Sequence, residues 1–222
     1  MAVDGKFLQS IPYFAGLSAA ELDSISRLVM EKKAERRDII LHEGEPAEAI
    51  YFVVSGALKL FKTSAEGKEQ ILSILRPGDS FNDVPVFDDG SNPASAEAMG
   101  PVVLYELGKS DFKALLRNNS VVAANTITVL AEQVRRMVSL IEDLSFRHVI
   151  GRVARILLEY ADGAAPGARL TQQDMAAMAG TAREVVGRSL KSLEQEGVIK
   201  FDRHRIVIVD REALTDMVES PL

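Results

Sequence analysis

The sequence predicts an α+β protein with an N-terminal jelly-roll β-barrel, a long helix and a C-terminal helical domain. Between residues 37 and 108, short apolar runs alternate with glycines, which is typical of many short strands joined by turns. After residue 109, apolar residues recur at helical spacing, first along one long segment and then on both sides of Gly180. A chain of 222 residues can bury two separate cores.

Composition excludes several classes of protein. Hydrophobic residues make up 47% and charged residues 26% of the chain, and no apolar run reaches the roughly 20 residues that a membrane helix needs. The N-terminal residues lack the basic and apolar segments of a secretory signal, so we expect a cytoplasmic protein with no membrane partner. The chain has no cysteine, which excludes disulfides, thiolate zinc sites and cysteine-ligated iron–sulfur clusters.

Charge is distributed unevenly along the chain. The formal net charge is -6 at pH 7. The segment 145–210 nevertheless holds ten Lys and Arg against eight Asp and Glu, a net +2 that leaves -8 for the remaining residues. Because nucleic-acid binding needs only a local positive face, this asymmetry favours a nucleic-acid partner at the C-terminal end.

A short helix is predicted first, within residues 17–32. Ser18 suits the N-cap, with Glu21 three residues later as its capping-box partner. One face of this helix is apolar and comprises Leu22, Ile25, Leu28 and Val29. The barrel strands follow from residue 37, with turns at Gly44, Gly56, Gly67, Gly78, Gly90 and Gly100.

A long helix is predicted after the barrel. Its apolar residues alternate at spacings of four and three, the heptad pattern of a coiled coil: Ala123, Ile127, Leu130, Val134, Met137, Ile141 and Leu144. We expect this seam to form a homodimer. The alternative that the same stripe packs on the protein's own barrel remains open at this point.

The C-terminal region begins near Phe146. A helix is predicted at 148–160, then a Gly/Pro-rich loop at 161–169, a hairpin of alternating charged and apolar residues at 200–210, and a short closing helix at 211–220. The chain is therefore divided into a sensor barrel at 1–118, a dimerisation helix at 119–145 and a C-terminal domain at 146–222.

Residues 170–200 have the pattern of a helix-turn-helix motif. Thr171 can cap the first helix, and Gly180 can supply the positive φ of a tight turn. Thr181 is expected to cap the second helix, with Glu184 as its capping-box partner. The residues predicted to face inward are Met175, Ala176, Ala179, Val185, Leu190 and Leu193.

Three charged residues are expected to project from the other side of the second helix: Arg183, Glu184 and Arg188. An arginine fork matches O6 and N7 of guanine, and a carboxylate accepts from N4 of cytosine in the major groove. The same residues could instead form surface ion pairs on an ordinary exposed helix. Spacing alone does not separate these two interpretations.

Several segments together resemble the cyclic-AMP receptor protein and fumarate–nitrate regulator (CRP/FNR) superfamily of transcription regulators. These are HEGEPAEAIYFVVSGALKLFK in the barrel, the heptad helix, FRHVIGRVARILLEYA after it, and LTQQDMAAMAGTAREVVGRSLKSLEQEGVI at the helix-turn-helix. The resemblance covers nearly the whole chain and implies a cyclic-nucleotide-binding-like barrel and a winged helix-turn-helix. It also implies that Arg183, Glu184 and Arg188, in the motif R-E-x-V-G-R, read a TGTGA-like half-site, repeated as TCACA, in double-stranded DNA.

A dimer of such motifs is expected to read a palindrome whose half-sites lie about one helical turn, roughly 34 Å, apart. Phosphate contacts are expected from the starts of the two helices and from the second helix: Thr171, Gln172, Gln173, Thr181 and Lys191. The loop at 162–169 corresponds to a surface that some relatives use to contact RNA polymerase, so that partner is expected too. A solvated linker is the alternative interpretation of this loop.

The effector segment of the barrel departs from the nucleotide-binding pattern of this superfamily. Relatives that bind cyclic nucleotides carry a cassette resembling F-G-E-L and then R-S or R-A, in which Glu holds the ribose and Arg the cyclic phosphate. Here Phe81, Asn82 and Asp83 begin the segment, and Asn92 followed by Pro93 stands in place of the arginine. A buried phosphate would lack its cationic partner, so we do not expect cyclic AMP to be the effector.

The sequence leaves the identity of the effector unknown. Candidate pocket residues come from this segment and from two apolar positions of the long helix: Phe81, Asn82, Asp83, Asn92, Ala94, Ser95, Met137 and Val138. Met137 and Val138, which the resemblance places where the long helix would meet adenine, are both apolar, and this favours an apolar or planar effector, or a pocket that has been lost. A haem-based gas sensor, with His42 and His148 as iron ligands, and an effector-independent regulator are the alternatives.

Two other classes of protein fit the sequence less well. A jelly-roll enzyme of the cupin type would need clustered metal ligands, but the three histidines, His42, His148 and His204, are scattered along the sequence. No G-x-S-x-G, P-loop or G-x-G-x-x-G motif is present, so no enzymatic activity is expected. A protein-binding adaptor can use the same fold, but the R-E-x-V-G-R residues favour DNA.

Overall fold

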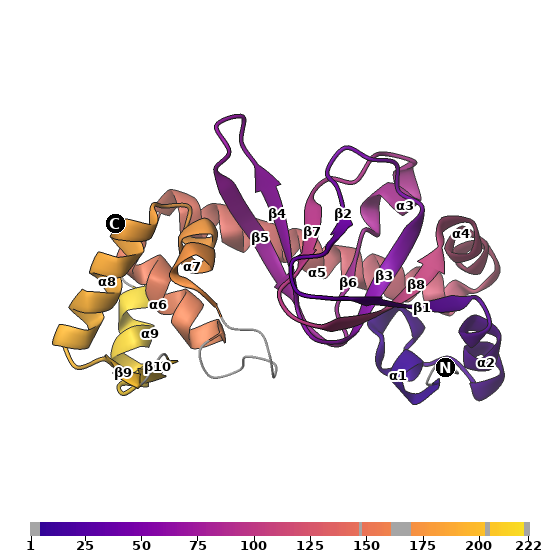
Figure 1. The fold of residues 1–222 in the computed structure, drawn as a ribbon. Coiled ribbons are helices and arrows are strands. Elements are labelled where there is room, and N and C mark those ends of the chain that lie inside the picture. The colour runs from indigo at the N-terminus through magenta and orange to yellow at the C-terminus, as the bar shows by residue number, and fades with distance from the viewer. Residues whose placement is uncertain (1–4, 147, 161–169, 203–204, 220–222) are drawn as a thin grey trace. The chain divides into compact units, whose positions relative to one another are not determined.

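The computed structural model describes residues 5–146, 148–160, 170–202 and 205–219. The chain divides into two compact units, residues 1–62 with 73–135 and residues 63–72 with 136–222. Most of the strands and the first part of the long helix belong to the first unit, and the helix-turn-helix belongs to the second (Figure 1). The predicted α+β fold class is confirmed.

Three short helices precede the strands: α1 (Gly5–Ser10), the 3-10 helix η1 (Pro12–Phe14) and α2 (Ala19–Ser26). The predicted cap of α2 is confirmed, because the Ser18 N–H donates to the Glu21 carboxylate at 2.8 Å and the Glu21 N–H donates to Ser18 Oγ at 3.4 Å. The helix predicted over 17–32 is too long, since Val29 already begins a strand. Pairing with a distant strand overrides the helical pattern there. The sequence reasoning also missed α1 and η1.

In the described part of the chain, the barrel strands form two four-stranded sheets of a jelly-roll (Figure 1). The strands are β1 (Val29–Ala34), β2 (Ile39–Leu41), β3 (Ala49–Ser55), β4 (Leu58–Thr63), β5 (Glu69–Leu75), β6 (Ser80–Phe81), β7 (Ser95–Ala98) and β8 (Val102–Gly108). Their order is β1-β8-β3-β6 in one sheet and β2-β7-β4-β5 in the other. The first strand therefore pairs with the last, from Val29 opposite Leu107 to Ala34 opposite Val102.

Alternate residues of the strands build two separate cores, because successive side chains of a strand point to opposite faces. One core joins the two sheets and includes Tyr51, Phe81 and Leu104. The other uses the intervening positions, such as Phe52 and Leu107. Its helical side is formed by α1, η1, α2, α4 (Lys109–Asn118) and the first turns of α5 (Ser120–Phe146).

The turn between β3 and β4 requires a glycine. Gly56 has a φ of +84°, which lies in the left-handed region that favours glycine. A Cβ atom at this position would lie 2.3 Å from the carbonyl oxygen of Pro101. Both the backbone conformation and the lack of space therefore require glycine here.

The C-terminal elements follow the predicted order. They are α6 (Val149–Tyr160), α7 (Gln172–Ala179), α8 (Arg183–Gln195), β9 (Ile199–Asp202), β10 (Arg205–Ile208) and α9 (Arg211–Glu219). The apolar faces of these helices meet in one core around Val153, Met175, Leu190 and Leu214. The hairpin predicted at 200–210 is confirmed as the antiparallel pair β9 and β10. Among the described helices, none is long and apolar enough to cross a membrane.

Candidate functional site

The turn between α7 and α8 is built by local sequence signals. Thr171 caps α7 as predicted, because its hydroxyl accepts from the Asp174 N–H at 3.1 Å and its own N–H donates to the Asp174 carboxylate at 2.8 Å. Gly180 ends α7 with a φ of +62°, also as predicted. The Thr181 N–H donates back to the Ala176 carbonyl oxygen at 3.0 Å, which completes the C-terminal cap of α7.

The start of α8 differs from the prediction by one residue. Thr181 is still part of the turn, and Ala182 is the N-cap, with no side-chain cap bond. The capping box expected between Thr181 and Glu184 is therefore wrong. One of the predicted inward residues of α8 is also wrong: Val185 is only half-buried and Val186 is fully buried instead, whereas Leu190 and Leu193 are buried as predicted.

One face of α8 carries the predicted base readers. Arg183, Glu184, Arg188 and Lys191 are all exposed. At 3.6 residues per turn they lie within an arc of about 140° that excludes the buried Val186, Leu190 and Leu193. Among the described residues, these four side chains form no ion pair and no side-chain hydrogen bond. The surface ion pairs of the alternative interpretation are thus not formed in this structure.

A residue that the sequence reasoning missed holds this motif in place. Arg152 on α6 is half-buried, and its Nε donates a hydrogen bond of 2.8 Å to the carbonyl oxygen of Ala179. The last carbonyls of a helix lack partners within the helix. Arg152 therefore links α6 to the turn that orients α8.

The residues predicted to contact phosphates differ in exposure and in whether their polar groups are already hydrogen-bonded. Both polar groups of Thr171 are used inside the capping box. Gln173 is exposed, and Gln172 and Thr181 are half-buried. Gln172 lies beside α8, with its Oε1 3.9 Å from the position that a Cβ on Gly187 would take. The start of α7 is thereby placed next to α8.

Helix α5 presents an exposed apolar stripe. The relative exposures of its predicted seam residues are 70% for Ile127, 62% for Val134, 42% for Met137, 63% for Ile141 and 38% for Leu144, and Leu130 is half-buried. Other residues, Val122, Thr126 and Val129, are the ones buried against the helix's own unit. For Ile127 and Val134, which belong to the same unit as the barrel, the alternative in which the seam packs on that barrel is therefore wrong.

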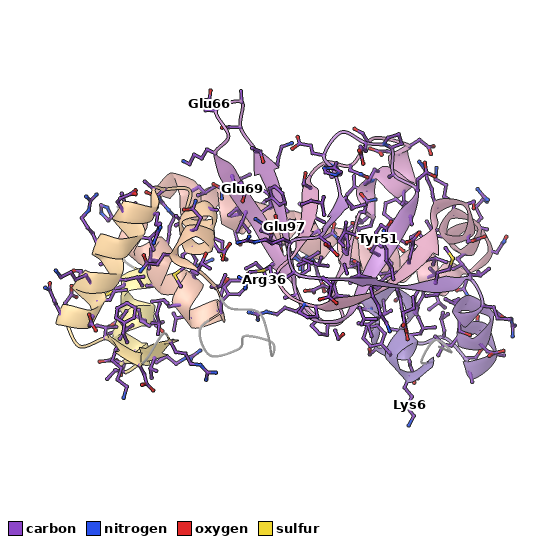
Figure 2. All side chains as sticks on the ribbon, viewed as in Figure 1. Lys6, Arg36, Tyr51, Glu66, Glu69 and Glu97 are labelled. Atoms are coloured by element: carbon purple, nitrogen blue, oxygen red, sulfur yellow. The ribbon has the colours of Figure 1, made fainter. Side chains whose placement is uncertain are left out.

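The effector segment of the barrel runs from β6 through α3 (Val84–Asp88) to β7. We call residues 81–95 the cassette. Phe81 stacks on Tyr51 with ring centroids 5.1 Å apart (Tyr51 is labelled in Figure 2). Ala94 is buried, and Ser95 Oγ accepts a hydrogen bond from the Glu43 N–H at 3.0 Å.

Two buried asparagines fix the ends of the cassette. Asn82 has a φ of +64° and donates from Nδ2 to the Ala49 carbonyl oxygen at 3.0 Å. Asn92 donates from Nδ2 to the His42 carbonyl oxygen at 3.0 Å, and its N–H donates to the Glu45 carbonyl oxygen at 2.8 Å. Asn92, which stands where nucleotide-binding relatives carry arginine, is thus bound to the loop before β3.

Asp83 is the most enclosed charged group of the cassette, with only 4% of its surface exposed. Its Oδ2 accepts hydrogen bonds from the Tyr13 hydroxyl, from Gln133 Nε2 at 2.6 Å and from Ser80 Oγ at 3.3 Å. Hydrogen bonds of this kind offset the cost of burying a carboxylate. The donors belong to η1, α5 and β6.

Cations do contact the cassette, but carboxylates already pair with them. Lys62 Nζ donates to the Pro93 carbonyl oxygen at 3.1 Å and lies 2.6 Å from the Glu43 carboxylate. Asp89, which follows α3, pairs with Lys109 at 2.8 Å and Lys113 at 2.7 Å. These two lysines lower the pKa of Asp89 to about 2.

The structure does not bring the remaining candidate residues for the pocket and for haem together with the cassette. Met137 and Val138 are 42% and 58% exposed, and they belong to the second unit, whereas the cassette belongs to the first. His42 is exposed and follows β2 rather than lying on a strand, and His148 is exposed before α6. No group of three metal-ligating side chains occurs among the described residues. His204 and the loop at 162–169 lie outside the described residues.

Known proteins share both halves of this chain. The cyclic nucleotide-binding domain matches residues 31–119, and the Crp-like helix-turn-helix domain matches residues 151–217. The chain is 34% identical over 195 residues to the cyclic AMP receptor protein of Thermus thermophilus, covering 87% of this chain and 90% of that protein. It is 27% identical to the CRP-like cAMP-activated global transcriptional regulator of Mycobacterium tuberculosis, covering 90% and 93% respectively.

A solved structure agrees with these relatives. FixK2 from Bradyrhizobium japonicum is similar with a TM-score of 0.77 at 27% sequence identity, covering 86% of this chain and 98% of that one. The jelly-roll barrel, the long helix and the helix-turn-helix thus occur together in this chain and in its relatives. The chain belongs to the CRP/FNR family of DNA-binding transcription regulators.

Proposed function

We propose that this protein is a homodimeric regulator that reads a TGTGA-like palindrome with Arg183, Glu184 and Arg188. The observation that carries the proposal is the outer face of α8, where these exposed side chains have no partner among the described residues. They can therefore bind base edges without breaking existing bonds. Each good bidentate contact contributes about 1–3 kcal/mol of discrimination.

The backbone of the DNA is contacted beside this face. Gln172, Gln173, Thr181 and Lys191 are close to the starts of the two helices or on α8 itself, where phosphates meet unpaired N–H groups and a cation. Thr171 contributes by ordering the start of α7, since its hydroxyl and N–H are used in the capping box. These contacts set the register of the protein but carry no sequence information.

The exposed stripe of α5 is the dimer interface in this proposal, and its occupant is the same stripe of a second copy. Spacings of three and four residues between Ile127 and Leu144 match the seam of a two-stranded coiled coil. A two-fold axis along the seam explains a palindromic site. The chain then comprises a sensor barrel at 1–118, a dimerisation helix at 119–145 and a DNA-binding domain at 146–222.

The effector is not cyclic AMP in this proposal, although relatives of the chain are named for that ligand. The side chain of Asn92 is neutral and hydrogen-bonded within the protein. The carboxylate of Asp83 is turned toward Tyr13 and Gln133. A cyclic phosphate would lack its cation, and a ribose would have to compete with three existing donors to Asp83.

The test is a fluorescence-anisotropy titration against a TGTGA-N6-TCACA duplex and a scrambled duplex, each with and without cyclic AMP. We expect specific binding that cyclic AMP leaves unchanged. Arg183→Ala is expected to weaken binding to the palindrome by about 10- to 100-fold and to the scrambled duplex much less.

The matched control is Arg36→Ala, which removes an exposed arginine from the barrel unit (Arg36 is labelled in Figure 2). Equal losses on both duplexes would show that Arg183 does not read bases. A requirement for cyclic AMP would overturn the interpretation of Asn92.

A further inference from the structure

Asp83 is a buried carboxylate whose described partners are all neutral. An ionised group in the protein interior is costly unless hydrogen bonds replace its water. Tyr13, Ser80 and Gln133 supply those bonds, and all three converge on Oδ2. Such an arrangement fixes the direction of the carboxylate.

Two of the three donors, Tyr13 and Gln133, bring together parts of the chain that are far apart in sequence. Tyr13 is 70 residues from Asp83, and Gln133 is 50 residues from it. Tyr13 is also bound to α5 directly, because its carbonyl oxygen accepts from Asn125 Nδ2 at 3.1 Å. A second bond from Asn125 Nδ2, to the Ala15 carbonyl oxygen at 2.8 Å, holds the same N-terminal segment. The cassette, η1 and α5 are thus joined in one network.

We infer that Asp83 is a positioning residue that clamps the cassette to α5, and that it is not a contact for the effector. The family pattern places an acidic residue here toward a ribose, but in this chain the donors to Oδ2 come from the protein itself. Removing a donor should loosen the cassette even though the donor lies on another element. An effector that displaces the cassette would strain the bond between Gln133 and Asp83.

The network also adjoins the exposed stripe. Gln133 directly precedes Val134, which is 62% exposed, and Val129 and Gln133 lie one turn apart on the side of α5 toward its own unit. The bond at 2.6 Å is therefore the contact of the clamp with α5 next to residue 135, where the first unit ends. A link from the cassette to dimerisation through α5 rests on the proposed function of the stripe. The clamp between Asp83 and Gln133 does not rest on that function.

The clamp is tested by hydrogen–deuterium exchange of the full chain. Gln133→Met keeps the length of the side chain and removes the donor. We expect amide exchange in the cassette peptide 82–92 to rise about tenfold or more, as for the loss of a hydrogen bond to a charged group. Asp83→Asn is expected to raise exchange in the peptide 120–135. Glu132→Ala, an exposed neighbour of Gln133, is the control and should leave the cassette unchanged.

A double-mutant cycle in urea-induced unfolding gives a second measurement. Because one bond links the two side chains, Asp83→Asn and Gln133→Met together should destabilise less than the sum of the single changes. Tyr13→Phe replaces a donor on η1 with little change of shape and is expected to raise cassette exchange as well. Unchanged cassette exchange in both Gln133→Met and Tyr13→Phe, or additive destabilisation, would refute the clamp.

The two proposals fail in different ways. If the wild-type protein does not bind the palindrome, the proposed function is wrong, but the exchange measurement still tests the clamp. If the palindrome is bound and Gln133→Met alters neither exchange nor affinity, the clamp is wrong and the regulator stands. Altered exchange together with a changed affinity for the palindrome supports both.

Discussion

Arg152 Nε and the carbonyl oxygen of Ala179 are joined by a hydrogen bond of 2.8 Å between α6 and the last residue of α7. The bond holds the residue that Gly180 and the start of α8 follow directly. A half-buried cation that binds a helix C-terminus also meets the negative end of the helix dipole.

Arg152→Met is expected to destabilise the second unit by about 1–3 kcal/mol, since it leaves a carbonyl without its charged donor. Urea-induced unfolding followed by circular dichroism measures this change. Lys200→Met, an exposed cation on β9, is the control and should stay within about 0.5 kcal/mol of wild type. Equal effects of the two changes would show that the Arg152 bond is unimportant.

Val134→Asp and Ile141→Asp are expected to disrupt the dimer. Each change places a carboxylate in the proposed seam, where burying an ion costs several kcal/mol. The dimer dissociation constant should rise by about a hundredfold or more in analytical ultracentrifugation. Ser139→Asp adds the same charge to an exposed position away from the stripe and should leave the dimer intact. If all three variants stay dimeric, the interface lies elsewhere.

Stability is expected to fall in alkaline solution through Tyr51. Burial, with smaller contributions from Glu106 and Glu48, raises the pKa of Tyr51 to about 12. A tyrosine in the unfolded chain has a pKa of about 10, so between about pH 10 and pH 12 only the unfolded state releases this proton. The contribution of Tyr51 is fully present below about pH 10 and is lost as the pH rises toward about 12.

This pH dependence can be measured by urea-induced unfolding at a series of alkaline pH values, with near-ultraviolet absorbance reporting tyrosinate. Tyr51→Phe removes the titrating group while keeping a ring to stack on Phe81. Its stability should decline less steeply than that of wild type across the same pH range. Parallel curves for the two proteins would contradict the assignment to Tyr51.

A comparison of Gly56→Ala with Gly67→Ala separates two reasons for glycine at a turn, the left-handed backbone conformation and the lack of space for a Cβ atom. Their φ values are similar, +84° and +79°, but a Cβ at Gly67 would have no atom within 4 Å. Gly67→Ala should therefore cost about 1–2 kcal/mol, the cost of the left-handed backbone alone. Gly56→Ala should cost clearly more, because the Pro101 carbonyl must move. Similar losses in thermal unfolding would contradict this difference.

Local signals were predictable from the sequence. Ser18 and Thr171 cap helices and Gly180 ends one, because each depends on residues within one turn of the chain. Arg183, Glu184 and Arg188 were also placed correctly on the exposed side of α8, since helical spacing alone decides which side is apolar. Val185 was wrongly predicted to face inward in place of Val186, which lies four residues before Leu190 and seven before Leu193 and so shares their buried face.

Features that depend on distant residues were not predictable. The strand at Val29 is formed by pairing with β8, which begins 73 residues later at Val102. The role of Asp83 depends on Tyr13 and Gln133, and no local pattern brings those residues to it. The sequence marked Asp83 only as a candidate pocket residue, through the resemblance of its segment to the nucleotide-binding pattern. Its partners require the folded barrel.

The pairing of β1 with β8 governs how a growing chain can fold on the ribosome. Strand β8 lies between β1 and β3 in that sheet and cannot form until residues 102–108 have been translated. Until then, β1 and β3 lack the strand that pairs with both of them. Unpaired apolar strand edges associate with other chains. A chain that ends before β8 is therefore expected to aggregate and not to form a smaller barrel, whereas the helices after residue 148 can fold from neighbours already close in sequence.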